Sequence, residues 1–173
     1  MTSHTHVSRP DLFAFFDTLD IKTTTVEHEA VFTVEESDKL CREMPGGHTK
    51  YLFLKDAKDR LFLFVAEAHA TVDMKSLHKT LGCARLSFGK PDLLLEVLGV
   101  TPGSVTALSI INDKHNRVSI VIDEALMAFD LINSHPLTNT ATTSIARDDL
   151  LTFIRATGHE PQFIVLSPRA EDQ

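Results

Sequence analysis

The stretch KYLFLKDAKDRLFLFV, residues 50–65, decides the fold class of this 173-residue chain. Two apolar runs, 50–54 and 61–65, flank a short polar segment at 55–60. Apolar runs of this length, bounded by turn residues, are typical of buried β-strands. We therefore predict a hairpin at the centre of the fold, with both of its strands heavily buried.

Outward from this hairpin, helix and strand signals alternate along the chain. Pro10, Asp73 and Pro91 are suited to helix starts, and Gly82, Gly99 and Gly158 to helix ends. The predicted helices are 10–19, 33–42, 73–81, 91–98 and 147–157. Further strands are predicted at 22–28, 131–134, 142–145 and 163–166, and a second hairpin from 107–112 and 117–122. Hairpins interspersed with helices indicate a mixed α+β sheet rather than an alternating parallel one.

Composition favours one soluble domain. Hydrophobic residues make up 43% of the chain and charged residues 24%, an ordinary globular balance. No repeat or linker divides residues 1–173, so a single domain with a core of about 10–167 is expected. Apolar runs too short for a membrane span, no export signal and two cysteines without CxxC spacing favour a cytoplasmic location. The net charge of −7 argues against non-specific coating of nucleic acid, but it does not exclude binding of one end of an RNA in a local pocket.

Several common chemistries lack their motifs. The chain has no GxGxxG, GxxxxGK[ST], GxSxG or HExxH pattern. Its nine histidines are scattered without metal-ligand spacing, so no metal site is expected.

Three segments are harder to explain by structure alone. Residues 46–50 (GGHTK) set a glycine pair before a lysine at the mouth of a buried strand, which permits close approach of a ligand or simply forms a loop. Residues 99–106 (GVTPGSVT) form either a tight turn or a set of backbone donors for an oxyanion. Residues 134–142 (SHPLTNTAT) hold a histidine before proline, followed by hydrogen-bonding side chains that can also satisfy their own loop.

Together and in this order, these segments resemble the prolyl-tRNA editing family. These are free-standing proteins similar to the editing domain of bacterial prolyl-tRNA synthetases. The matching stretches spread over roughly residues 10–165 and are EHEAVFTVEE (27–36), HTKYLFLKD (48–56), LGVTPGSVTALSIIN (98–112) and HPLTNT (135–140). Within the family, the pattern is closest to the alanyl-specific branch.

The resemblance implies a mixed, partly barrel-like sheet with flanking helices and hydrolysis of mischarged Ala-tRNA for proline without a cofactor. It implies the acceptor end of aminoacyl-tRNA as partner and prolyl-tRNA synthetase as a further candidate. Lys50 would stabilise developing negative charge and His135 would orient the ribose. Gly103, Ser104 and Thr106 would supply the donor turn, Asn139 would contact the terminal nucleotide, and Val31 and Phe32 would wall a small pocket that admits alanine and excludes proline.

Two positions depart from the family pattern. Ala107 stands where the glycine-containing loop usually ends in proline, and Tyr51 stands where a small polar residue often follows the lysine. Both departures bear on substrate preference more than on the fold. The alternatives are a deacylase for a tRNA carrying cysteine or serine, a non-catalytic module that binds the tRNA end, and a small-molecule hydrolase unrelated to tRNA.

Overall fold

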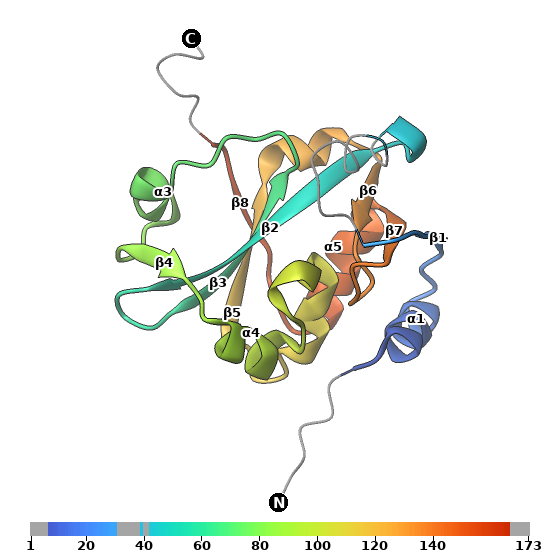
Figure 1. Cartoon of the computed structure of the whole chain (residues 1–173), viewed down its shortest axis with the longest axis horizontal. Helices are drawn as coiled ribbons and strands as arrows, with labels where there is room; N and C mark the ends of the chain where they lie inside the picture. Colours follow the sequence, from blue (N-terminus) through green and yellow to red (C-terminus); the bar gives the residue numbers. More distant parts are fainter. Residues whose placement is uncertain (1–6, 31–38, 40–41, 167–173) are drawn as a thin grey trace, which may run out of the picture.

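A computed structural model of the chain describes residues 7–30, 39 and 42–166 (Figure 1). The described strands form an eight-stranded mixed sheet in the order β1-β7-β6-β2-β3-β5-β8, with β4 paired to β2 off this path. Helices flank the sheet, so the predicted α+β fold class is confirmed.

The predicted central hairpin is present. Strands β2 (Gly47–Asp56) and β3 (Leu61–Glu67) pair antiparallel, and the register runs from Thr49 opposite Glu67 to Lys55 opposite Leu61. On the β3 side, β5 (Val118–Asp123) and β8 (Gln162–Ile164) continue the sheet in parallel.

The other side of β2 is built from chain segments far apart in sequence. Strand β6 (Leu131–Ser134) pairs parallel with the start of β2. Strands β7 (Ala141–Ala146) and β1 (Thr23–Glu27) then follow in antiparallel pairing. The short β4 (Leu86–Phe88) pairs with the far end of β2. The start of β2 therefore meets β6, while its end meets β4.

Side chains alternate between two cores, one on each face of the sheet. Leu61, Leu63 and Val65 of β3 belong to the larger core, whereas Phe62 and Phe64 belong to the smaller one. The larger core is covered by α1 (Arg9–Thr18), α4 (Pro91–Leu98) and α5 (Arg147–Ala156). The smaller core is covered by α3 (Met74–Leu81). Because both faces are covered, β3 is apolar and buried from Leu61 to Ala66.

Local capping explains why the helix bounds could be predicted. The Asp73 side chain accepts the Lys75 backbone N–H at the start of α3, and Gly82 ends that helix in the left-handed conformation (φ 69°). Gly99 ends α4 in the same way (φ 71°). The predicted helix at 33–42 lies almost entirely outside the described residues.

One predicted element is wrong. Residues 107–112 form a 3-10 helix, η2 (Ala107–Asn112), instead of one strand of a second hairpin, so β5 pairs with β3. The Thr106 hydroxyl accepts the Leu108 backbone N–H and thereby caps the turn. Five of its six residues are buried, so its apolar pattern has no periodicity that could separate a strand from a helical turn. Two further 3-10 turns, η1 (Pro102–Ser104) and η3 (Glu124–Ala128), precede and follow this region.

Candidate active site

The glycine pair at the start of β2 is required by close packing against Phe129 and Leu131, at the start of β6. A Cβ added to Gly46, whose φ is +109°, would lie 2.5 Å from the Leu131 carbonyl oxygen. A Cβ on Gly47 would lie 2.7 Å from the Phe129 ring. Contacts this close exclude a side chain, so the pair is explained by close strand approach rather than by a flexible loop.

Lys50 follows directly on β2 and is partly buried. Its ammonium donates a hydrogen bond to the Ala70 carbonyl oxygen. By alternation along the strand, Lys50 shares its face with Leu52 and Leu54, which border the smaller core. The ammonium is therefore held beside the connection that leads into α3.

Tyr51 lies on the opposite face and connects three segments. Its hydroxyl donates to the Ser134 hydroxyl at 2.8 Å and also contacts the Thr49 hydroxyl. Hydrogen bonds from the Thr106 side chain and the Ala107 backbone complete the cluster. Burial raises the pKa of Tyr51 more than these hydrogen bonds lower it, so the phenol stays protonated at neutral pH. This hydroxyl fixes the turn before η2 to β2 and β6.

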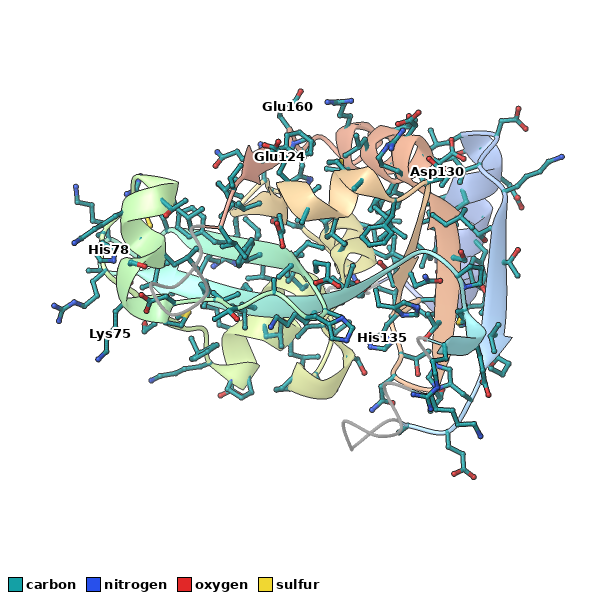
Figure 2. All side chains as sticks on the ribbon, turned by 90° about the horizontal axis from the view of Figure 1, so that it is seen from above. Lys75, His78, Glu124, Asp130, His135 and Glu160 are labelled. Carbon is teal, nitrogen blue, oxygen red and sulfur yellow. The ribbon has the colours of Figure 1, made fainter. Side chains whose placement is uncertain are left out.

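His135 follows β6 at the same level as Lys50 on the neighbouring strand. The last residues paired between β2 and β6 are His48 and Asn133, and Lys50 and His135 each lie two residues beyond them. The rings of Tyr51 and His135 are 6.5 Å apart, centre to centre. Figure 2 shows His135 beside the sheet, well away from Lys75 and His78 at the far end.

The protonation state of His135 follows from its surroundings. Its pKa is lowered because burial disfavours the charged ring; the Ala141 carbonyl partly offsets this, and the nearby His28 adds to it. The Nδ1 atom lies 3.3 Å from the Ala141 carbonyl oxygen, which can only accept, so Nδ1 carries the proton. Nε2 is thus an acceptor, and no hydrogen-bond partner for it exists among the described residues.

The loop after His135 brings Asn139 to Gly103. A Cβ built on Gly103 would lie 3.5 Å from Asn139 Nδ2, so the η1 turn and this loop are in contact. Leu137, between His135 and Asn139, has a φ of 67°, which is unusual for a bulky side chain. Strained backbone of this kind is common at functional loops.

The donor turn is only partly free to bind a substrate. The Ser104 backbone N–H donates to the Thr101 carbonyl at 2.9 Å. Thr106 is fully buried, and its hydroxyl caps η2. We therefore expect Thr106 to shape the wall of the site. Val31 and Phe32, the predicted pocket residues, lie outside the described residues.

The comparisons with known proteins identify the family. Residues 28–153, well over half of the chain, match the model of the aminoacyl-tRNA editing domain. The chain belongs to this family. It is 39% identical over 161 residues to prolyl-tRNA synthetase associated domain-containing protein 1 of Danio rerio, covering 92% of this chain and 86% of that protein. It is 35% identical over 149 residues to prolyl-tRNA editing protein ProX of Acetoanaerobium sticklandii, covering 86% and 91%.

The fold agrees with this assignment. A solved structure of a candidate trans-editing enzyme for prolyl-tRNA synthetase matches with a TM-score of 0.68 at 18% identity, covering 96% of this chain and 99% of that one. The predicted resemblance to the prolyl-tRNA editing family is confirmed. An editing domain hydrolyses aminoacyl-tRNA, so the predicted enzyme class is confirmed as well.

The editing-domain site contains residues to which the sequence assigned no role. His28 donates or accepts a hydrogen bond with the Thr142 hydroxyl at 2.8 Å and lies close enough to His135 to lower its pKa. Its place at the end of β1 is visible only once β1 pairs with β7. The sequence marks Tyr51 only as a departure from the family pattern, because its partners Ser134, Thr106 and Ala107 are more than 50 residues away.

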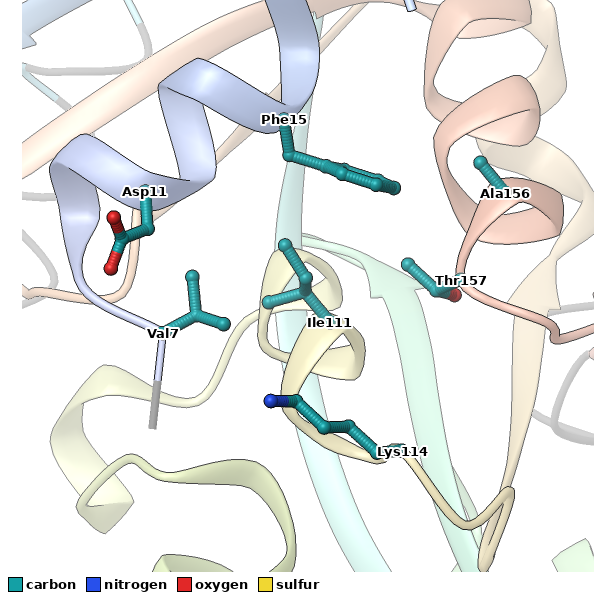
Figure 3. Close-up of a pocket in the computed structure, with 7 residues that line it drawn as sticks. All are labelled: Val7, Asp11, Phe15, Ile111, Lys114, Ala156 and Thr157. Carbon is teal, nitrogen blue, oxygen red and sulfur yellow. The ribbon is translucent and has the colours of Figure 1, made fainter. Parts of the chain in front are cut away.

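Other features of the editing domain lie apart from these residues. A cavity of about 310 Å³ opens between α1, η2 and the end of α5, and none of the predicted site residues lines it (Figure 3). Within the described ranges, no group of three or more His, Cys, Asp or Glu is placed to hold a metal ion. No helix in those ranges has the length and apolar character needed to cross a membrane.

Proposed function

We propose that this editing domain hydrolyses the ester that joins alanine to the tRNA for proline. The observation that carries the proposal is the placement of Lys50 and His135 at one level of two adjacent strands. Asn139 and Gly103 meet at the end of the loop that begins with His135. A cation, a neutral imidazole and a polar turn are groups that ester hydrolysis can use.

The proposed reaction uses water as nucleophile. Water adds to the carbonyl carbon of the ester, and the Lys50 ammonium stabilises the oxyanion that forms. His135 Nε2 accepts a hydrogen bond from the water or from the neighbouring ribose hydroxyl, because Nδ1–H is fixed on Ala141. The bond between carbonyl carbon and ribose oxygen then breaks, and the ribose oxygen takes the proton that the attacking water gave up. Alanine and tRNA are released.

In the resting state, Lys50 is held by the Ala70 carbonyl. A neutral carbonyl is a weaker partner than a developing oxyanion, so the ammonium can exchange one for the other as the charge forms. This gives stabilisation that is stronger in the transition state than in the ground state.

The amino-acid preference is proposed to be steric. Val31 and Phe32 would close the side-chain pocket, with room for alanine but not for proline, as in the second sieve of editing enzymes. The names of the relatives connect them with prolyl-tRNA synthetase or prolyl-tRNA editing, and this supports the tRNA for proline as substrate. A partnership with the synthetase itself belongs to the same proposal.

The test is a panel of the tRNA for proline charged with alanine, cysteine, serine or proline. Rapid loss of alanine, with proline retained, is the expected result. Faster loss of cysteine or serine would keep the enzyme class and overturn the steric argument. Binding of the charged end with no cleavage of any ester would favour a non-catalytic module. Adding purified prolyl-tRNA synthetase to the same assay tests the partnership, since a real partner should raise the rate.

A further inference from the structure

Charge is distributed unevenly along this acidic chain. Residues 50–90 contain eight Lys and Arg and four Asp and Glu, a net charge of +4. The rest of the chain contains nine Lys and Arg and twenty Asp and Glu, a net charge of −11. The positive segment comprises most of β2, with β3, α3 and β4.

The fold gathers these cations at one end of the molecule. Asp56, at the end of β2, is buried and accepts hydrogen bonds from Arg60 Nε at 2.9 Å and from the Ala84 backbone N–H at 3.3 Å. This carboxylate joins the β2–β3 turn to the segment that enters β4. Lys58, Arg60 and Arg85 are therefore exposed around one fixed point.

Helix α3 adds two cations on the same side. Leu77 is buried in the smaller core, while Lys75 and Lys79 are exposed one turn apart. Like charges at this spacing destabilise a helix, and the first turn, which holds Lys75 and no acidic residue, favours acidic residues. Neither lysine has an ion-pair partner among the described residues. Lys79, in the last turn, is favourably placed against the helix dipole, so Lys75 is the charge that the helix itself does not favour.

Exposed acidic residues outside the positive segment lie along another part of the molecule. In Figure 2, Glu124, Asp130 and Glu160 are spread along one edge, whereas Lys75 and His78 occupy the far end. Glu124 begins η3, Asp130 directly precedes β6, and Glu160 lies between α5 and β8. A polyanion approaching the molecule is therefore attracted to one end and repelled from that edge.

The cationic end of the molecule adjoins the candidate site at Lys50. Lys50 shares its sheet face with Leu52 and Leu54, on which α3 packs. The Lys50 ammonium bonds the Ala70 carbonyl, three residues before the Asp73 cap of α3. A substrate whose reactive end lies at Lys50 can thus extend along α3 without crossing the acidic edge.

We propose that Lys58, Arg60, Lys75, Lys79 and Arg85, the α3 surface, bind the phosphate backbone of the acceptor helix of the same tRNA. The proposal rests on the proposed function, because that function places the charged end of the tRNA at Lys50. A-form RNA presents closely spaced phosphates, and proteins recognise it largely by backbone shape and charge. Exposed lysine and arginine on rigid elements suit such contacts. Local cations thus allow a chain of net charge −7 to bind RNA.

The experiment compares two charge reversals of equal size. The test variant is Lys75→Glu with Lys79→Glu, and the matched control is Lys22→Glu with Lys114→Glu, two exposed lysines outside the positive segment. Each variant is assayed on alanyl-tRNA for proline and on alanine esterified to adenosine, which has no helix. A second test variant, Lys58→Glu with Arg85→Glu, decides the question if α3 does not tolerate the first.

We expect the test variants to raise KM for alanyl-tRNA at least about tenfold with kcat unchanged. We also expect the slope of binding affinity against salt concentration, on logarithmic axes, to fall by about one phosphate contact for each cation removed. Alanyl-adenosine should be hydrolysed as by the wild type. An equal effect of the control variant, or an equal loss on alanyl-adenosine, would overturn the proposal.

A wild type that cleaves neither ester would refute the proposed function separately. Binding of uncharged tRNA would then still test whether the α3 surface contacts RNA. Weaker binding by the test variants than by the control supports it, and equal binding overturns it.

Discussion

Replacing Tyr51 with phenylalanine removes one oxygen atom from the point where three segments of the site meet. The ring stays, so packing against the larger core and the contact with His135 are kept. What is lost is the hydrogen bond to Ser134 at 2.8 Å and the contacts with Thr49, Thr106 and the Ala107 backbone. The change therefore isolates the hydroxyl cluster.

The loss of stability depends on which partners of the Tyr51 hydroxyl keep a second hydrogen bond. Thr49 still reaches the Asn133 carbonyl, and Thr106 still caps Leu108. Ser134 is 2% exposed and loses the donor at its hydroxyl, so it is left without compensation from water. A buried polar group left unpaired costs about 1–3 kcal/mol. For a domain of this size, about 2 kcal/mol corresponds to a fall in Tm of roughly 4–8 °C.

Urea unfolding of Tyr51→Phe and wild type measures this difference directly. The control is Ser87→Ala, which removes an exposed hydroxyl that donates to the Lys55 carbonyl at 3.4 Å, and it should change the free energy of unfolding by less than about 0.5 kcal/mol. If Tyr51→Phe unfolds within that same margin of the wild type, the hydroxyl does not hold the site together and the reasoning is wrong.

Three further predictions concern backbone, charge and proton binding. Gly46→Ala should lower the free energy of unfolding in urea by well over ~1 kcal/mol, because the new Cβ meets the Leu131 carbonyl. Gly82→Ala, also at positive φ but in open space, should lower it by about 1 kcal/mol. Equal losses in the two variants would contradict the close approach at Gly46. Burial raises the pKa of the Asp113 carboxyl, but hydrogen bonds from His159 and two backbone amides lower it by more, so its pKa in the folded protein is below the ordinary value. The stability that this carboxylate contributes is therefore present above the ordinary pKa of about 4 and is lost as pH falls through the lower folded value. The deficit of Asp113→Asn in urea unfolding should therefore shrink between pH 7 and pH 3, and a deficit that grew would refute this. Since the pKa of His135 is lowered, kcat/KM should hold steady as pH falls to about 6.5, and a midpoint above that value would argue against a neutral imidazole.

Much of the fold could be predicted because its signals are local. The cap at Asp73, the stop at Gly99 and the paired apolar runs of β2 and β3 each lie within a few residues of the element they define. The prediction of a strand at 107–112 was wrong because burial of five of these six residues removes the periodicity. The three-residue β4 was missed because it is fixed by pairing with β2, more than 30 residues earlier.

The candidate site, too, could be predicted only where its signals are local. Lys50, His135 and Asn139 could be selected from local patterns and a family resemblance, but their mutual placement depends on the parallel register of β2 and β6. The cluster around Tyr51 joins residues 49, 51, 106 and 134, which no local pattern connects. The glycine pair at 46–47 suggested an approach to a ligand, whereas its neighbours in the structure are Leu131 and Phe129.

Lys50 is proposed to provide the charge stabilisation for release of alanine from the tRNA for proline. The measurement is single-turnover release of alanine by the wild type and by Lys50→Ala, at equal concentrations of folded protein. We predict rapid release by the wild type and a loss of about 100-fold or more in the variant, the usual effect of removing one oxyanion-stabilising group. Equal rates in the two proteins, or no release by the wild type, would contradict the claim.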